Sequence, residues 1–585
     1  MEYVLKERIG KPELFTGRKE ELAFFLNWIN DIKEEKSQST AILARRKMGK
    51  TALLERLFNI TFDNNDGVIP FYYEVKKVEM WVVDFCKDFF LTFIYQYMAF
   101  KTRKKEYLDP GNKTNLETAI QRVKKEGLNY LSEFIQGVKD AIELDSIDNL
   151  WLMVRDAPRS IAARRDEFIV QMIDEFQYLN AMIYRDQKTS PSQLMKTLAG
   201  GYMSTAESKV APLLVSGSWV GWLMHELNTM LPARFRLKIF RNMSQDEAVE
   251  MVFKYSGFLG VPVTEETAYL IAQMAEGSPF YISAILRSNF KGKNLTTIQG
   301  LTETLEFEIL DDEGNIKFTW MEYVNAAFNE VNQLNAKNIV LYLCQHNNRQ
   351  VTRKELLEKL SIDMTDRDLE IKMNALIKAD IINKGRSNSE YQGVPDNIFD
   401  KVFRGVYEKE IQEFDPKVIG QEIHATFNEL KKKYHSLLGK FNYQKGYFAE
   451  YVILILLKNR ARKLNDLLKS VTRNLPVDFN FGEYRRVWRY DGAMEFGHEF
   501  NVDIFALPKS NTDYAIIGEV KHREAKKFSR EEAISFMEKY AELKTRENLE
   551  RVIPFVFSLT GFTKEAEKYC QETGIACSED LRWLD

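Results

Sequence analysis

The chain has few cysteines, and no two of them stand in a ligand-like spacing. Cys86, Cys344, Cys570 and Cys577 are the four cysteines, and no CxxC pair occurs. This distribution disfavours both a zinc site and a disulfide framework. It is typical of proteins that stay in the reducing cytoplasm, so we expect a cytoplasmic protein with free thiols.

The sequence also lacks an apolar run of membrane-spanning length. The richest candidate, residues 80–100, contains Asp84, Lys87 and Asp88, which predicts a buried or amphipathic helix. The first eleven residues lack the apolar core of a signal peptide. Low-complexity tracts and solenoid repeats are absent too. We therefore expect no membrane partner and no repeat architecture.

The chain also has no large excess of positive or negative charge, since the formal net charge is −3. Any contact with nucleic acid must then come from local basic patches. With 585 residues the chain is too long for one core, which predicts three or four domains. A hydrophobic content of 45% and a charged content of 29% fit a soluble globular protein.

Residues 44–51, ARRKMGKT, end like a phosphate-binding loop. An apolar run (39–44) precedes the loop and helical spacing follows it (51–59), which is the strand, loop and helix that phosphate binding needs. Backbone N–H groups would face the phosphates, Lys50 would reach the outer ones and Thr51 would hold Mg²⁺. Gly49, Arg46 and Ala52 complete the expected nucleotide contacts. Gly-Lys-Thr alone is a weak signal, so this context decides.

Ala44 stands where the loop pattern has glycine. If that position needs a positive φ, alanine costs about 1 kcal/mol, which is less than tenfold in affinity. We expect ATP binding to survive this change, whereas ATP hydrolysis stays open.

A second apolar strand (167–180) ends in Asp174-Glu175. Beside the loop strand, Asp174 could anchor the Mg²⁺ shell and Glu175 could act as catalytic base; the alternative is a solvated acidic turn. A third strand (211–218) ends in Ser216 and Ser218, either of which could sense the γ-phosphate. A plain serine-rich strand exit is the other interpretation.

In this order, these motifs resemble the archaeal-type ATPases of the STAND class, which are related to origin-recognition ATPases. The resemblance covers about residues 13–410. It implies that LFTGRKEEL (14–22) places Arg18 near the adenine, that LPAR (231–234) supplies Arg234, and that EGSPFYI (276–282) belongs to a helical lid. Residues 116–144 predict one helix within an insertion at about 80–160.

Residues 337–396 predict three helices followed by a short β-ribbon, which is the pattern of a winged helix. The family resemblance also implies one at this place. Its third helix, around 367–379, mixes acidic and basic residues. That mixture favours regulatory packing over reading of a DNA groove.

Near the C-terminus, residues 501–507 and 514–524 predict two strands joined by a turn at 508–513. In such a hairpin Asp503 and Glu519 can meet across the sheet, and Lys521 projects from the same strand face as Glu519. Two carboxylates, the Val520 carbonyl and an ammonium suit Mg²⁺-dependent phosphodiester cleavage. The alternative is a hairpin with a surface salt bridge.

This layout resembles the PD-(D/E)XK, restriction-endonuclease-like nucleases. The resemblance implies that a leading helix (443–458) supplies Glu450 as the first acid and metal ligand, and that residues 529–544 and 552–581 provide helix, strand, helix and strand. Some members of that group have a glutamine four residues before a helix tyrosine, here Tyr540, and this chain has Phe536 at that position. Basic clusters at 458–463, 484–490 and 521–527, with Trp488 and Tyr490 among arginines, favour contact with nucleic acid.

The sequence thus predicts a P-loop NTPase with a parallel sheet (1–240), a helical lid (241–330), a winged helix (331–415) and a restriction-endonuclease-like α/β domain (416–585). The expected function is an ATP-regulated, Mg²⁺-dependent nuclease that acts on DNA, with RNA left open, in defence or mobile-element control. The ATPase part could form homo-oligomers. Alternatives are a signalling NTPase with an inactive nuclease domain, and a DNA-repair motor with nuclease activity.

Overall fold

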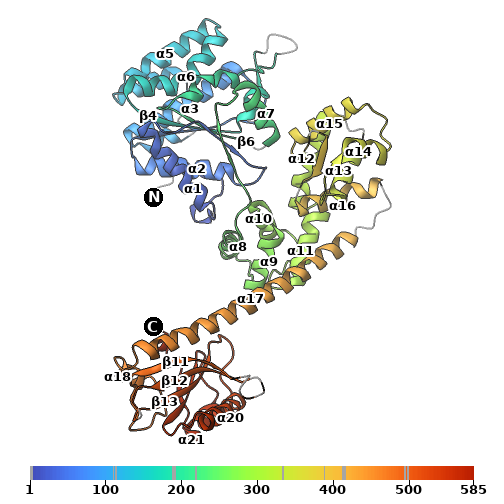
Figure 1. Cartoon of the computed structure of the whole chain (residues 1–585). Helices are drawn as coiled ribbons and strands as arrows, with labels where there is room; N and C mark the ends of the chain where they lie inside the picture. The colour runs from blue at the N-terminus through green and yellow to red at the C-terminus, as the bar shows by residue number, and fades with distance from the viewer. Residues whose placement is uncertain are drawn as a thin grey trace. The chain divides into compact units, whose positions relative to one another are not determined.

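The chain is a multidomain α/β protein in its computed structural model (Figure 1). The structure describes residues 4–584 except 110, 112–114, 187–192, 218–219, 332–334, 386, 388, 395, 412–416, 493–495, 497, 499 and 511. It divides into two compact units, Met1–Lys431 and Lys432–Asp585. The boundary falls inside helix α17 (Lys417–Asn459). Among the described residues, no helix is both long and apolar enough to cross a bilayer.

Unit 1 is built around a parallel five-stranded sheet in the order β2-β4-β6-β1-β7. Its strands are β1 (Thr40–Leu43), β2 (Val68–Glu74), β4 (Phe168–Asp174), β6 (Leu213–Gly217) and β7 (Arg236–Ile239). The prediction that the strand ending in Asp174 lies beside the loop strand is wrong, because β6 separates β4 from β1. Strand order depends on long-range packing that strand patterns do not encode.

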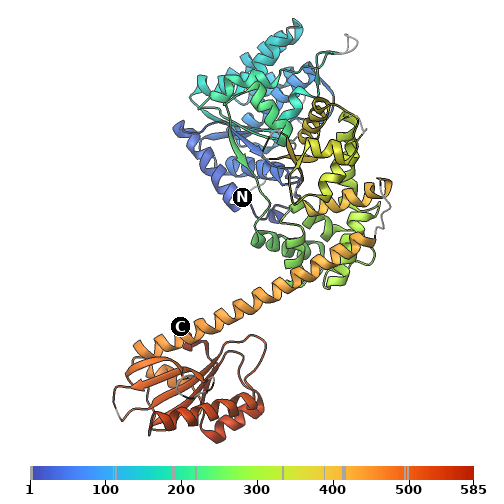
Figure 2. The same ribbon diagram turned by 45° about the vertical axis from the view of Figure 1, so that its right-hand side comes forward.

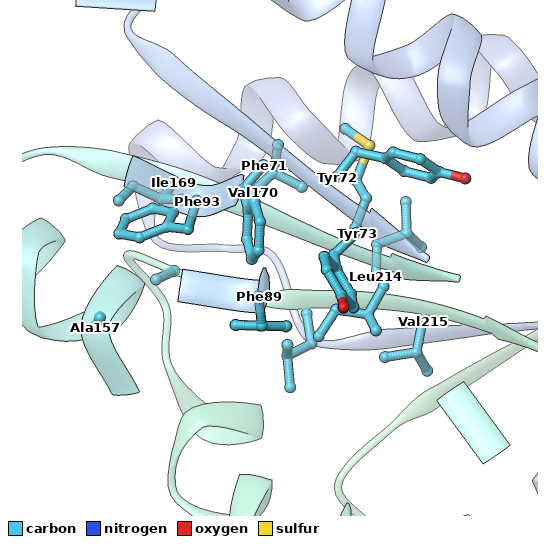
Figure 3. Packing of buried hydrophobic residues seen from close by; sticks show 14 of the residues in the cluster. Phe71, Tyr72, Tyr73, Phe89, Phe93, Ala157, Ile169, Val170, Leu214 and Val215 are labelled. Atoms are coloured by element: carbon cyan, nitrogen blue, oxygen red, sulfur yellow. The ribbon is translucent and has the colours of Figure 1, made fainter. Parts of the chain in front are cut away.

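Helices cover both faces of this sheet. Helices α1 and α2 lie on one face, and α3 and α6 lie on the other (Figure 1; Figure 2). Aromatic side chains of β2 and α3, among them Phe71, Tyr73, Phe89 and Phe93, pack against Ile169 and Val170 of β4 (Figure 3). The helices of this part are α1 (Lys19–Asn30), α2 (Lys50–Asn64), α3 (Val82–Thr102), α4 (Leu116–Lys125), α5 (Tyr130–Glu143), α6 (Ile147–Arg165) and α7 (Val220–Met230).

The single helix expected at 116–144 is two helices, α4 and α5. Gly127 has a φ of 75° between them, a conformation that interrupts an α-helix. Short elements complete this region: β3 (Met80–Trp81) pairs with β5 (Ile183–Tyr184). The 3₁₀ helices are η1 (Pro12–Leu14), η2 (Asp31–Glu34), η3 (Lys105–Leu108), η5 (Phe176–Asn180), η6 (Ala199–Met203) and η7 (Thr205–Glu207).

Helices form the expected lid after β7. They are α8 (Gln245–Leu259), α9 (Glu265–Met274), α10 (Pro279–Arg287), α11 (Ile298–Leu310) and α12 (Asn315–Val331). Gly277 has a φ of 72°, and a Cβ there would collide with the carbonyl oxygen of Met243. Ser278 is the N-cap position of α10, and Pro279 is in the first turn. Glycine and proline thus fix where this lid helix begins.

The three helices and the β-ribbon expected at 337–396 are present, with one strand that the sequence did not predict. The elements are α13 (Ala336–Gln345), β8 (Val351–Thr352), α14 (Arg353–Lys359), α15 (Asp366–Lys378), β9 (Ile382–Lys384) and β10 (Glu390–Gly393). The unpredicted β8 pairs with β10 in the sheet order β8-β10-β9. The third helix, α15, contacts α12 and also α7, which follows strand β6 of the parallel sheet. Helix α16 (Asn397–Ile411) follows.

Unit 2 holds a second five-stranded sheet, in the order β11-β12-β13-β14-β15. The first three strands are antiparallel to each other and the last three are parallel. The elements are α18 (Asn465–Ser470), β11 (Tyr484–Asp491), β12 (Asn501–Pro508), β13 (Ala515–Lys521), α20 (Arg530–Arg546), β14 (Val552–Ser558), α21 (Lys564–Thr573), β15 (Ala576–Ser578) and η8 (Leu581–Trp583). The expected hairpin and the expected strand–helix–strand tail are both present.

Candidate nucleotide and metal sites

The candidate phosphate-binding loop joins the buried strand β1 to helix α2. Gly49 is the N-cap of α2, with a φ of 83°, and Lys47 has a φ of 61°. Ala44 does not lie in the left-handed region. The expected cost of about 1 kcal/mol for alanine at this position therefore does not arise, because the loop makes its sharp turn at Lys47 and Gly49.

Lys50 lies inside the loop, with its side chain almost fully buried. Its ammonium donates hydrogen bonds of 2.9 Å to the carbonyl oxygens of Ala44 and Arg45. Burial lowers the pKa of Lys50, while the negative charges of Glu175 and Asp174 act in the opposite direction. The loop thus surrounds a desolvated cation, and pairing with an anion would offset the free-energy cost of its burial.

Asp174 at the end of β4 is fully buried and gathers donors from three elements. Thr51 Oγ1 donates to its Oδ2 at 2.5 Å, and the Ser216 hydroxyl of β6 donates to its Oδ1. The backbone N–H of Glu175 donates to Oδ1 at 3.0 Å. The structure thus brings Thr51, Asp174 and Ser216 together, although β4 and β1 are not neighbours.

Glu175 follows directly, in a left-handed conformation with a φ of 55°. Its Oε2 accepts a hydrogen bond of 2.5 Å from Gln177 Nε2. Ala52 lies in the first turn of α2, directly after Thr51. Ser218, the second candidate for γ-phosphate sensing, lies outside the described residues.

Arg18 is tied to the loop from the N-terminal segment. Its guanidinium donates to the Met48 carbonyl at 3.0 Å and to the Arg241 carbonyl at 2.6 Å, and it pairs with Glu21 at 3.0 Å. Arg234 lies elsewhere, since its Nε pairs with Glu207 Oε1 of η7 at 3.2 Å. The structure therefore brings Arg18 to the loop but joins Arg234 to a different element.

A cavity of about 230 Å³ opens beside the loop. Its described lining comes from the loop, the segment after β7, the lid, α12 and Asp396: Arg45, Arg46, Lys47, Met48, Phe240, Arg241, Asn242, Glu276, Ser278, Phe280, Tyr281, Thr319, Trp320, Tyr323 and Asp396. Arg234 is not among these residues. The guanidinium of Arg46 stacks 4.0 Å from the ring centroid of Tyr323, and burial lowers the pKa of Arg46.

The aromatic wall of this cavity was not predicted from the sequence. Phe280 and Tyr281 belong to the EGSPFYI segment, which gave a usable signal, whereas Trp320 and Tyr323 sit in an ordinary amphipathic helix pattern. Tyr281 Oη donates to Asp396 at 2.7 Å and accepts from Trp320 Nε1 at 2.9 Å. These bonds connect α10 to α12 and to Asp396 around the cavity.

In unit 2 the β12–β13 hairpin aligns the two expected carboxylates. Ile504 pairs with Gly518, so the antiparallel register sets Asp503 opposite Glu519. Asp503 Oδ2 accepts a 2.9 Å hydrogen bond from the Val520 N–H, across the hairpin. Between Trp488 and Tyr490 the β11 register advances by two residues and the β12 register by three, from Phe505 to Val502. Such a bulge re-aims side chains locally.

Both carboxylates are buried, and one of them lacks a full set of partners. Lys521 Nζ pairs with Glu519 Oε1. The other oxygen, Glu519 Oε2, is buried without a hydrogen-bond partner among the described residues. A buried carboxylate oxygen of this kind fits a hard cation, which prefers oxygen ligands.

The charges of Asp503 and Glu519 also act on Glu450 of α17. Burial raises the pKa of Glu450 to about 7, and the charge of Asp503 adds to this rise. Burial, then the charge of Glu519, raises the pKa of Asp503 to about 6. Arg489 lies 3.4 Å from Glu450 Oε2. In the described part of the chain, however, no three His, Cys, Asp or Glu side chains are grouped to hold one ion. The strand register thus sets Asp503 opposite Glu519, and Glu450 interacts with both through its charge.

The basic clusters of unit 2 are partly neutralised. Arg462 and Lys509 both pair with Glu483, at 3.0 and 2.9 Å, and Arg523 pairs with Glu532 at 2.6 Å. The expected stacking role of Tyr490 is wrong, because its ring is buried against Phe500 and Phe505. Trp488 also packs on Phe505, at 4.7 Å between centroids.

Comparison with known proteins gives distant structural likenesses. No protein-family model and no curated protein matches the chain. The Walker-type ATPase PABY2304 of Pyrococcus abyssi is 14% identical, with 68% of this chain and 97% of that chain covered and a TM-score of 0.44. ORC2 of Aeropyrum pernix, in ADPNP–ADP complexes, is 12% identical, with 70% of this chain and 99% of that chain covered and a TM-score of 0.38. The RuvB Holliday junction branch migration motor of Thermotoga maritima is 13% identical, with 71% of this chain and 100% of that chain covered and a TM-score of 0.31. At these identities and TM-scores, the side-chain geometry above carries the functional proposal.

Proposed function

We propose that unit 1 binds and hydrolyses ATP with Mg²⁺. The observation that supports this most is the meeting of Lys50, Thr51, Asp174 and Ser216 at one end of the parallel sheet. A buried cation, a hydroxyl–carboxylate pair and a helix N-terminus are the groups that bind a nucleoside triphosphate and its Mg²⁺. Thr51 and Asp174 would hold Mg²⁺. Arg46 lines the cavity for the rest of the nucleotide, and Arg18 bonds to the carbonyls of Met48 and Arg241, which also line it.

In this proposal Glu175 takes a proton from the attacking water. Its left-handed backbone and its bond to Gln177 hold the carboxylate at the strand end. Glu175→Gln should therefore keep ATP binding within a few-fold and lower the turnover rate by about a hundredfold or more. Phosphate release by the full chain, with Lys77→Ala as an exposed-residue control, measures this. Unchanged turnover would remove Glu175 from the mechanism.

We also propose that unit 2 is a Mg²⁺-dependent nuclease that acts on DNA under control of the ATP site. The observation that supports it is the cross-hairpin pair Asp503 and Glu519, with one buried oxygen left unpartnered in the described structure. These carboxylates, with the Val520 carbonyl, would hold the ion. When bound, Mg²⁺ lowers the pKa of a water molecule and stabilises the charge of the phosphate.

The residues of this chain have separate tasks at such a site. Lys521, next to Glu519, positions or deprotonates the attacking water. Glu450 shares the negative field with Asp503, and Arg489 beside it offers a positive charge toward a phosphate. Burial of the carboxylates makes each of these electrostatic interactions stronger than it would be in water.

Plasmid cleavage tests the nuclease proposal. The full chain is incubated with supercoiled DNA and Mg²⁺, with and without ATP, beside Asp503→Asn and a matched surface control, Asp466→Asn. Cutting by wild type and the control, and none by Asp503→Asn, supports it. If wild type does not cut in either condition, unit 1 is a signalling NTPase with an inactive partner unit. Strong stimulation of ATP turnover by DNA favours a repair motor instead.

A further inference from the structure

A regular apolar seam runs along the part of α17 that belongs to unit 2. Leu437, Phe441, Gln444, Phe448, Tyr451 and Ile455 follow one another in steps of four, three, four, three and four residues. This alternation is the a/d pattern by which two helices pack along each other, with one polar member at Gln444.

The seam is exposed. Phe448 is 67% exposed, Tyr451 56%, and Phe441 and Leu437 53% each. The opposite face of the same helix is used within unit 2, where its residues join the hydrophobic core: Ala449, Ile453, Leu456 and Leu457. Because the core of unit 2 is served by that other face, the seam is left for a different partner.

The exposed area is large enough for a stable pair of chains. Seven exposed side chains are aliphatic or aromatic: the five apolar members of the seam, and Tyr443 and Tyr447 beside it. With about half of each ring exposed, the seam and its flanks offer roughly 800 Å² per copy, which is what a standard interface buries on each side.

We propose that this seam pairs with the same seam of a second copy of the chain. A heptad seam is complementary to itself, since each side chain of one helix enters a hole formed by the other. Two copies would set Gln444 against the partner's seam, where a polar residue fixes register. Lys445 beside the seam already pairs with Glu524 at 2.6 Å, so it adds little repulsion between the copies. This dimer does not depend on either proposed activity.

Sedimentation velocity of the full chain without nucleotide tests this pairing. Wild type should shift from monomer to dimer between sub-micromolar concentrations and about 50 µM. Phe448→Lys with Tyr451→Lys should weaken the dimer at least about a hundredfold, whereas Phe448→Leu with Tyr451→Leu should keep it. Val477→Lys, a fully exposed position of unit 2 outside α17, is the matched control and should behave as wild type.

Two results overturn the proposal. The first is a wild-type chain that stays monomeric at every concentration, whether its seam is bare or covered by unit 1 of the same molecule. The second is a double-lysine variant that still dimerises, because the copies then meet elsewhere. Circular dichroism checks that each variant is folded, and Leu437→Lys with Phe441→Lys replaces the first pair if that pair unfolds.

Discussion

Replacement of Lys50 by methionine should abolish useful ATP binding while the fold persists. The ammonium is nearly fully buried and donates to two loop carbonyls at 2.9 Å. With ATP present, it would make charge-assisted bonds to phosphate, which contribute about 1.5–3 kcal/mol each. Loss of about 3 kcal/mol lowers the affinity roughly 150-fold, from the micromolar range of about −8 kcal/mol to about −5 kcal/mol.

Stability should change much less than affinity. Methionine removes a desolvated charge but leaves the carbonyls of Ala44 and Arg45 without their donor, and these two effects oppose each other within about 1 kcal/mol. Titration calorimetry with MgATP measures the affinity, and thermal unfolding measures the stability. Lys77→Met is the control, as an exposed lysine after β2. A dissociation constant within threefold of wild type, in a folded variant, would refute the assignment of this loop.

Three further changes test the packing of unit 1. Burial raises the pKa of Glu55 from 4.5 to about 7, so the folded state holds the proton more tightly and stability falls as pH rises through that window. The stability of Glu55→Gln relative to wild type should therefore rise by about 2–3 kcal/mol between pH 5 and pH 8. Urea unfolding at both pH values measures this, and an equal difference between the two proteins at both would contradict it. Gly277→Ala should destabilise the lid by more than about 2 kcal/mol, because its Cβ meets the Met243 carbonyl at a positive φ; an unchanged melting temperature would show that the turn relaxes. Tyr281→Phe leaves the Trp320 N–H and a carboxylate without their partner and should cost about 2 kcal/mol in chemical denaturation, and a smaller loss than about 0.5 kcal/mol would mean that water replaces the hydroxyl.

Local patterns predicted the elements that carry the sites. The loop before Lys50, the hairpin that aligns Asp503 with Glu519 and the winged helix were all readable, because residue periodicity and turn residues act within a few positions. The same local logic failed at residues 116–144, where helical periodicity continues on both sides of Gly127 and hides the break. A helical pattern records which residues face inward, and it does not record a left-handed residue between two turns.

Sites that join distant segments needed the folded chain. Tyr490 and Trp488 look like stacking residues among arginines, yet the sheet turns them against Phe505. Arg234 sits in a motif that resembles a nucleotide-binding segment, but its partner is Glu207. Burial and pairing of this kind depend on which neighbour the fold supplies, and composition is the same in either case.

The sequence by itself determined that a strand, a glycine turn and a helix start meet at Lys50, and that two carboxylates share a hairpin near the C-terminus. The tertiary structure decided that β6 stands between β1 and β4, that Thr51 nevertheless reaches Asp174, and that the lid and α12 enclose the cavity beside the loop. The physical reason is range. Backbone conformation and side-chain alternation are set by neighbours in sequence, whereas strand order, burial and the partner of each charge are set by packing between segments more than a hundred residues apart.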